Sequence, residues 1–100
     1  MILEIAFVEI VPDRTAEFEV AIKRAVSEVL SHARGYIDFE LHKGIERNHT
    51  YTFHIHWESL EDHTVGFRES DQFAVWRGII GQYFAQSPLV EHWQAIDLLT

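Results

Sequence analysis

The 100-residue chain contains no cysteine, few basic residues and no hydrophobic run long enough to span a membrane. The lack of cysteine excludes disulfides, zinc–thiolate sites and thiol nucleophiles together. Eight Lys and Arg against sixteen Asp and Glu give a net charge of -8, and this field opposes binding to nucleic acid or to an anionic membrane surface. The apolar N-terminal stretch has no basic flank and is too short for a signal peptide. We therefore expect a soluble, cytoplasmic protein that binds neither nucleic acid nor membrane.

Residues 1–100 are expected to form one domain, because the sequence has no linker, no low-complexity tract and no internal repeat. The aromatic content of 13% is high, and Phe and Trp bury large apolar areas when they pack. This composition predicts a folded globular core rather than disorder.

Hydrophobic periodicity predicts the elements of the first half. Residues 2–10 form an apolar, β-branched run that Pro12 ends, which indicates a strand. Residues 14–33 carry apolar side chains at steps of three and four, which indicates an amphipathic helix. Asp13 or Thr15 can cap the start of this helix, and Gly35 suits its C-terminal cap.

The second half alternates and then becomes helical. Residues 36–43 and 50–57 alternate apolar and polar side chains, which predicts an antiparallel hairpin. A capping box from Ser59 and a second cap at Ser70 predict two helical segments, after which residues 89–98 return to strand-like composition. The order βαββαβ predicts an α+β, ferredoxin-like fold in which a four-stranded antiparallel sheet carries helices on one face.

The other face of this sheet is expected to be mixed in character. If the strands alternate regularly, it carries polar side chains beside a few apolar ones: Glu4, Asp38, Glu40, His42, Thr52, His54 and His56, with Ile2, Val8 and Ile10. Such a face either meets solvent or pairs with the same face of a second copy. We favour pairing into a homodimer.

The stretch HIHWESLEDH, residues 54–63, offers a metal site as one interpretation. His54 and His56 point to the same side of a strand, and Glu61 follows at a spacing reminiscent of metal-binding cupins. Coordination needs three or four converging ligands, and the pattern supplies two, since Glu61 is also explained by the start of a helix. We therefore predict no metal site and interpret the pair as polar histidines on the outer or dimer-facing side.

A pocket between sheet and helices is the second candidate site. Trp57 lies on the apolar side of its strand, where it packs in the core, walls a pocket for a flat aromatic ligand, or does both. His63, Arg68, Arg77 and His92 are the polar groups that could face such a pocket, although His63 could instead bond to the backbone and Arg77 could form a surface ion pair. The sequence has no Ser-His-Asp order, phosphate loop or dinucleotide fingerprint.

Several segments in order resemble the antibiotic biosynthesis monooxygenase family: LEIAFVEIVPD, a helix ending in ARGY, a strand ending in WES, HxxGFRESDxF and PLVEHW. The resemblance spans nearly the whole chain. It implies a ferredoxin-like monomer whose sheet pairs into a dimeric α/β barrel, with a pocket in each subunit. In the family a tryptophan on the third strand lines this pocket, and Trp57 matches it.

The resemblance also implies a chemistry. Members include cofactor-independent oxygenases of aromatic polyketides or quinols, and relatives that degrade haem. The haem-degrading relatives use an asparagine that falls near Ala6 and a histidine that falls near Trp76 and Arg77. Both are absent, which argues against haem degradation; His63 and His92 are the alternative haem ligands.

We therefore predict a monooxygenase that needs no cofactor and oxidises a small aromatic substrate. Its cavity is assigned to Trp57, Phe67, Phe73 and Trp76, its base to His63 or His92, and stabilisation of the substrate anion to Arg77. A non-catalytic dimeric ligand-binding or stress-response module of the same fold is the alternative, and a metal enzyme using His54 and His56 is a third.

Overall fold

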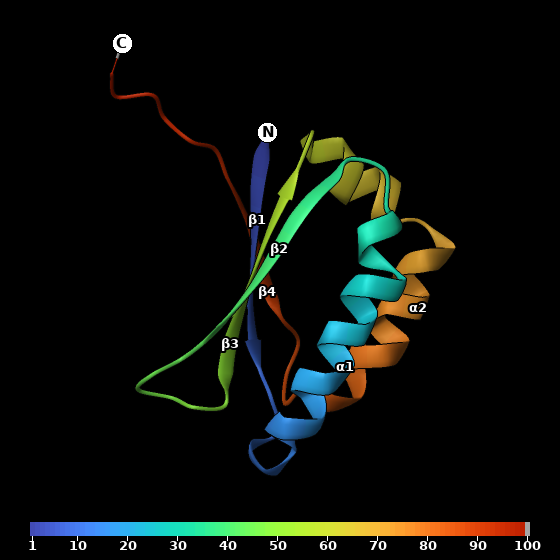
Figure 1. Cartoon of the computed structure of the whole chain (residues 1–100), viewed down its shortest axis with the longest axis vertical. Helices are drawn as coiled ribbons and strands as arrows, with labels where there is room; N and C mark the ends of the chain where they lie inside the picture. The colour runs from blue at the N-terminus through green and yellow to red at the C-terminus, as the bar shows by residue number, and fades with distance from the viewer. Residues whose placement is uncertain (100) are drawn as a thin grey trace.

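The computed structural model describes residues 1–99 and contains one antiparallel sheet with its helices on one side (Figure 1). The strands are β1 (Ile2–Glu9), β2 (Tyr36–Lys43), β3 (Thr50–Trp57) and β4 (Leu89–Trp93). They are ordered β2-β3-β1-β4 in a four-stranded sheet, so the first strand lies between the third and the fourth. This topology confirms the predicted ferredoxin-like, α+β fold.

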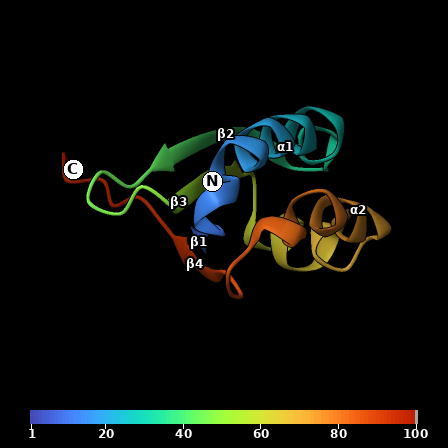
Figure 2. The same cartoon turned by 90° about the horizontal axis from the view of Figure 1, so that it is seen from below.

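Two longer helices, α1 (Thr15–Glu28) and α2 (Asp71–Ile80), cover the same face of the sheet (Figure 2). Short 3-10 turns adjoin them: η1 (Pro12–Arg14), η2 (Leu30–His32) and η4 (Gly81–Tyr83). The remaining helical element, η3 (Asp62–Phe67), is a π-helix that precedes α2. Within residues 1–99, no helix has both the length and the hydrophobicity that crossing a membrane requires.

Helix α1 is shorter than the predicted span of 14–33, because the backbone leaves helical geometry at Val29 and continues as η2. Neither Asp13 nor Thr15 caps it; Arg14 takes the N-cap position without a side-chain hydrogen bond. Gly35 lies in the turn just before β2 rather than capping the helix. Its φ of +83° and the closeness of Asp62, whose Oδ2 would lie 2.1 Å from an added Cβ, explain why glycine is needed there.

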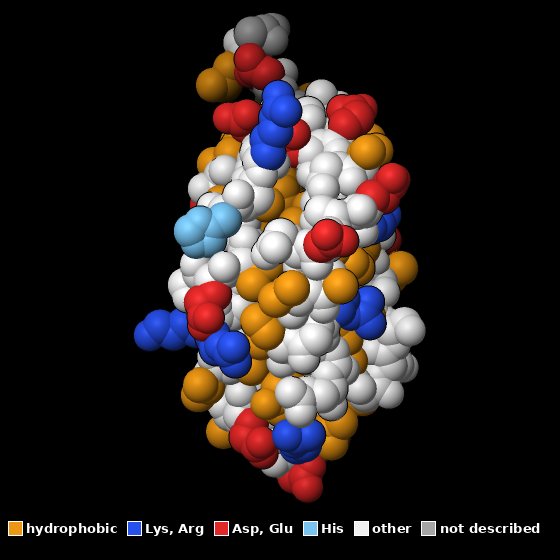
Figure 3. Space-filling view, turned by 90° about the vertical axis from the view of Figure 1, so that its right-hand side faces the viewer, with side chains coloured by type: hydrophobic (Ala, Val, Ile, Leu, Met, Phe, Trp, Pro, Cys, Tyr) orange, Lys and Arg blue, Asp and Glu red, His pale blue; other side chains and the backbone are white. Residues whose placement is uncertain are grey.

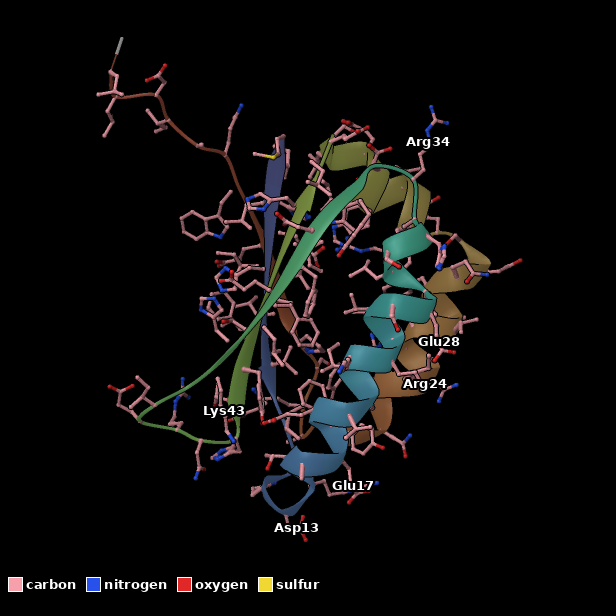
Figure 4. The ribbon with its side chains drawn as sticks, viewed as in Figure 1. Asp13, Glu17, Arg24, Glu28, Arg34 and Lys43 are labelled. Carbon is pink, nitrogen blue, oxygen red and sulfur yellow. The ribbon has the colours of Figure 1, made fainter. Side chains whose placement is uncertain are left out.

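The outer side of the helical layer is charged in both signs. Arg24 and Glu28 project from α1 away from the sheet (Figure 4) and form an exposed ion pair at 2.8 Å. Figure 3 shows this side of the molecule, where acidic and basic side chains are scattered between apolar ones. This surface shows no gathering of basic side chains of the kind that phosphate binding requires.

The core lies between the inner face of the sheet and the helices. β3 alternates as predicted, because Tyr51, Phe53, Ile55 and Trp57 are all buried. From α1 and the turn after it, the core takes Phe18, Ile22, Ala25, Val29 and Leu30. Burial of these side chains is the main source of the stability of the domain.

The predicted orientation of β1 is wrong. Glu4, Val8 and Ile10 were placed on the outer face, yet each is at most 5% exposed and lies on the inner side. The alternate residues of the strand, which include Leu3 and Phe7, face outward instead, and they pair with His56 and Thr52 of β3. The strand is apolar on both faces, so its sequence does not determine which residues point inward, and only pairing with β3 decides.

Two smaller predictions also differ from the structure. A bulge between Tyr36 and Asp38 in β2 turns Ile37 outward, where it is 42% exposed, and Tyr36 takes the inner position against Trp57. The last strand ends at Trp93, and residues 94–99 continue as an exposed, irregular segment that extends away from the domain (Figure 1).

Candidate active site

A cavity of about 320 Å³ lies between the inner face of the sheet and the segment that runs from η3 through α2. Its size is in the range of small-molecule binding sites. Side chains from all the surrounding elements line it: Glu4, Ala6, Leu30, Phe53, Ile55, His63, Phe67, Arg68, Phe73, Trp76, Arg77, Phe84, Pro88 and Val90. Five of the predicted site residues are in this lining, namely His63, Phe67, Phe73, Trp76 and Arg77.

Aromatic side chains form one wall of the cavity. Phe67 ends η3, and Phe73 and Trp76 lie on the inner side of α2, whose start is capped as predicted by the Ser70 hydroxyl accepting the Phe73 N–H at 3.4 Å. Phe67 packs edge-on against Phe73 at 5.6 Å and against Trp76 at 6.1 Å between ring centroids. These edge-to-face contacts fix the ring orientations and give a rigid, apolar wall.

The polar end of the cavity is built by strand register and one helical turn. Pairing of β1 with β4 places Glu4 directly beside His92. His63 extends from η3 so that its Nε2 lies 3.3 Å from Glu4 Oε1 and its Nδ1 hydrogen-bonds His92 Nε2 at 2.8 Å. Glu4, His63 and His92 therefore form a continuous row, which we call the Glu4–His63–His92 chain.

A π-turn positions His63 within this chain. The N–H of Arg68 donates to the carbonyl of His63, five residues earlier, at 2.9 Å. The capping contact expected at Ser59 is present, since its hydroxyl accepts the Asp62 N–H at 3.2 Å. Single π-turns occur often at functional sites, because the wider turn redirects the side chains it carries.

Trp57 is fully buried and does not line the cavity. Its indole N–H donates to Glu4 Oε1 at 2.9 Å, and its ring stacks on His63 at 5.3 Å. The Phe67 ring packs against the same indole, with 5.8 Å between the ring centroids. Trp57 therefore supports the polar groups from behind the cavity, and the bond to Glu4 supplies the partner that a buried indole N–H requires.

Burial raises the pKa of the Glu4 carboxyl from 4.5 to about 7, against the lowering effects of the Trp57 hydrogen bond and the Arg68 charge. Glu4 is 5% exposed, so its ionised form loses most of its hydration. Near neutral pH the carboxyl is therefore close to half protonated. A buried carboxyl that titrates at this pH and faces a cavity can accept and release protons in a reaction.

The histidines of the chain shift in the opposite direction. Burial, followed by the charges of Arg68 and His92, lowers the pKa of His63 to about 3, and burial with Arg68 lowers the pKa of His92. His63 is consequently neutral at pH 7, with one ring nitrogen that donates and one that accepts.

Two arginines line the same cavity and bring positive charge to it. Arg68 follows η3, and its charge influences the pKa of Glu4, His63 and His92. Arg77 lies on α2 with its guanidinium carbon 5.5 Å from the centre of the Phe84 ring, a cation–π contact that holds it at the cavity. Both side chains are positioned to attract an anionic group of a ligand.

The histidines of the HIH stretch lie on the opposite face of the sheet. His54 and His56 share an outer hollow of about 290 Å³ with Asp38 and Glu40, and His56 Nδ1 lies 2.7 Å from Asp38 Oδ1. Across residues 1–99, no three His, Cys, Asp or Glu side chains converge in a way that could hold a metal ion. His54 and His56 are thus separated from the cavity by the sheet itself.

Sequence reasoning missed Glu4 as a site residue. A charged residue in the middle of an apolar strand, between Leu3 and Ile5, is a signal that could have been used, because such a residue is rarely buried unless it has partners. The partners come from η3 and β4, distant in sequence, and only the folded chain brings them together.

The comparisons with known proteins agree with this fold. The family model of the antibiotic biosynthesis monooxygenases matches residues 1–78. The uncharacterized protein YczJ of Bacillus subtilis is 36% identical over 96 residues, which cover 96% of this chain and 100% of YczJ.

Solved structures extend the similarity to three dimensions. A Bordetella bronchiseptica protein named for the antibiotic biosynthesis monooxygenases superposes with a TM-score of 0.90 at 38% identity, covering 95% of this chain and 96% of its own. A Caulobacter crescentus protein named for the same family has a TM-score of 0.80 at 20% identity, covering 96% and 90%, and supports the fold alone. The chain therefore belongs to the antibiotic biosynthesis monooxygenase family.

Proposed function

We propose that the protein is a monooxygenase that oxidises a small aromatic molecule, such as a phenol or hydroquinone, with dioxygen and without a bound cofactor. One observation supports this most strongly: an aromatic-walled cavity ends on a buried carboxyl whose pKa is raised to about 7. Membership of the family and the names of its solved relatives favour the same reaction type. A flat ring fits against Phe67, Phe73 and Trp76, and an ionisable hydroxyl reaches the polar end.

The substrate supplies all the electrons in this scheme. Removal of a proton from a hydroquinone gives an electron-rich anion that can reduce dioxygen directly. One oxygen atom enters the ring and the other leaves as water, so hydroquinone and O₂ yield hydroxyquinone and H₂O by a four-electron oxidation of the ring. The protein must take up a proton, stabilise the anion and keep bulk water away from it.

Arg77 is the group that we assign to stabilisation of the substrate anion. Its guanidinium lines the cavity beside the Phe84 ring, and it carries a permanent positive charge with several N–H donors. Arg68 lines the same cavity and adds a second positive charge. A charge-assisted hydrogen bond in an apolar cavity is stronger than the same bond in water.

The activity is tested by anaerobic incubation with a panel of hydroquinones, followed by addition of oxygen. We expect oxygen uptake and the absorbance of a hydroxyquinone to rise together in a one-to-one ratio. His63→Ala and Trp57→Phe should slow both signals, whereas His32→Ala, a change at an exposed histidine of η2, should leave them unchanged.

Turnover by the parent that does not exceed that of His63→Ala contradicts the proposed activity. Saturable quenching of tryptophan fluorescence by the same compounds, with no oxygen uptake, would instead indicate the ligand-binding module.

We also propose that the outer sheet face pairs with that of a second copy. The outer face has two halves of different character. The half on β1 and β4 is mainly apolar, and the half on β2 and β3 is polar. The mainly apolar half comprises Leu3, Ile5, Phe7, Leu89 and Trp93 with one acid, Glu91, and the polar half Asp38, Glu40, His42, Thr52, His54 and His56. Trp93 is 52% exposed, which is unusual for so large an apolar side chain without a partner.

The molecular mass in solution scattering tests this pairing. The parent should have the mass of a dimer, and Trp93→Glu should shift it toward a monomer because a charge then enters the apolar half. Val20→Glu is the matched control, since Val20 is an exposed apolar residue on α1, on the other side of the molecule. A monomeric mass for the parent contradicts the pairing.

A further inference from the structure

We propose that Glu4 takes the proton of the substrate and that His63 and His92 pass it on to solvent. This assignment rests on the proposed oxidation of an ionisable aromatic substrate and adds a route for the proton that the substrate hydroxyl loses before dioxygen reacts. One proton is taken up again when the second oxygen atom leaves as water, so the overall oxidation releases none. It differs from the sequence-based prediction, in which His63 or His92 is itself the base.

Glu4, His63 and His92 follow one another from the cavity to the surface, which is the order that a proton relay requires. Glu4 lines the cavity and His63 lies 3.3 Å from it, while His92 accepts or donates at 2.8 Å on the other side of His63. His92 is only partly buried, so the chain begins at the cavity and ends at a ring in contact with water. The side chains come from β1, η3 and β4, and strand pairing fixes two of them side by side.

Glu4 is also oriented for this role. The contacts to Trp57 and to His63 both involve Oε1. We therefore assign Oε2, the other carboxylate oxygen, to the hydroxyl of the substrate. The bond from the buried Trp57 N–H orients the ionised carboxylate, and either carboxylate oxygen can accept it.

Proton affinity favours Glu4 over His63 as the acceptor. The pKa of His63 is lowered to about 3, so at pH 7 its cation is too acidic to persist as the product of substrate deprotonation. The pKa of Glu4, raised to about 7, lies where a general base works best at neutral pH. The charged groups that line the same cavity are Arg68 and Arg77. The charge of Arg68 stabilises ionised Glu4, and both arginines favour the substrate anion.

The transfer balances as one proton in and one proton out. Ionised Glu4 takes the hydroxyl proton on Oε2, which leaves the substrate as its anion. A turn of the carboxyl group then exchanges its two oxygens and brings this proton to His63 Nε2, to which Glu4 gives it. His63 releases the proton on Nδ1 to His92 Nε2, and His92 releases the proton on its own Nδ1 to water. Each imidazole ends in its other tautomer and returns to the starting one before the next turnover, while Glu4 is ionised again.

The experiment measures oxygen uptake with a hydroquinone substrate as a function of pH. Glu4→Gln keeps the shape and the bond from Trp57, so it should fold, yet it should lower kcat by about 100-fold or more because it cannot accept a proton. Glu61→Gln, at an exposed acid just before η3, is the matched control and should leave kcat unchanged.

His92→Ala tests the relay separately from the base. It should lower kcat by about tenfold, and added imidazole should restore most of the loss by replacing the missing ring as proton carrier. The same addition should not restore Glu4→Gln. A purely structural role of His92 would give no rescue by imidazole.

The outcomes separate the relay from the proposed function. If the parent oxidises no substrate, the proposed function fails. If the parent is active but Glu4→Gln keeps kcat within about threefold, Glu4 is not the proton acceptor and the proposed function stands. If Glu4→Gln is inactive but imidazole does not rescue His92→Ala, Glu4 remains the base and the relay through His63 and His92 is overturned.

Discussion

Glu4 on the inner sheet face and Glu40 on the outer face are the same residue type, and each lies beside a histidine. Burial raises the pKa of Glu4 to about 7, whereas the hydrogen bond with His42 lowers the pKa of the exposed Glu40. The histidine neighbours do not explain the difference, because both acids have one. Access to water explains the difference. Loss of hydration destabilises the ionised carboxylate and raises its pKa, whereas a carboxylate that remains hydrated is further stabilised by a hydrogen-bond donor, which lowers its pKa.

The comparison shows which face can carry acid–base chemistry at neutral pH. A group changes its protonation during a reaction only if its pKa lies near the working pH, and burial achieves this for Glu4. The outer cluster is richer in histidine and first suggested a metal site, yet its side chains are partly or fully exposed to water and lie opposite the cavity. The number of ionisable residues in a stretch is therefore a poorer guide to a site than their solvation.

Replacing Trp57 with alanine should have the largest effect, because it removes the support of the inner cluster. Trp57 is fully buried against His63 and Phe67, so its loss leaves a large void and removes the hydrogen-bond donor of the Glu4 carboxyl. We expect a loss of about 3–5 kcal/mol in the free energy of unfolding, measured with urea. A loss below about 1 kcal/mol would show that the cluster does not depend on the tryptophan.

Replacing Glu4 with glutamine should stabilise the protein at alkaline pH. The folded state retains a proton on Glu4 up to about pH 7, while the unfolded chain releases it near 4.5, so ionisation of Glu4 lowers stability as the pH rises between these values. Glu4→Gln removes this loss. Its gain over the parent should reach about 3 kcal/mol at pH 8 and vanish below pH 4.5.

Thermal and urea unfolding at matched protein concentration measure this gain. His63 contributes in the opposite sense, because its lowered pKa makes folding more favourable as the pH rises from about 3 to 6.5. The difference between parent and variant isolates Glu4 from this background. Equal stability of the two proteins at pH 8 would mean that the Glu4 carboxyl does not carry a raised pKa.

Replacing Trp57 with phenylalanine tests the effect of one hydrogen bond on the pKa of Glu4. The Trp57 N–H lowers the pKa of Glu4, so its removal should raise this pKa above 7. The cost in stability should be about 1–3 kcal/mol, because Glu4 loses a buried partner. Carbon-13 NMR of the carboxyl group across a pH series measures the shift directly, and a lower pKa would contradict the assignment.

The smallest effect is expected at Glu40. Its pKa is lowered, so its contribution to stability is present above its unfolded pKa and disappears as the pH falls through the folded value. Glu40→Gln should therefore destabilise slightly at neutral pH, the opposite sign to Glu4→Gln. About 0.5 M salt should remove the effect, since solvated charges are screened. Melting curves with and without salt provide the measurement.

Most of the fold could be predicted from the sequence, and the errors have physical causes. Strand β3 and helix α1 each have a single apolar face, so the side that is buried follows from the spacing of apolar residues in the sequence. Phe67, Phe73 and Trp76 were correctly expected to meet at one cavity because they share one side of consecutive helical segments. The bulge at Tyr36 and the end of β4 at Trp93 depend on neighbouring strands and carry no local signal.

The candidate site was predictable only in part. His63, Arg77 and the aromatic wall lie at the cavity as expected, whereas Trp57 lies behind it and His92 reaches it through His63. Their roles in catalysis remain predictions.

By itself the sequence determined the order of the elements, the face of each amphipathic segment and, through its motifs, the family. Tertiary structure alone decided which side of β1 is buried, since that strand is apolar on both faces and only its pairing selects Glu4 for the interior. Tertiary structure also brought His63 and His92 to Glu4 and removed the water around them. Solvation is a property of the folded molecule, and it is the loss of solvent that gives Glu4 a pKa near neutrality.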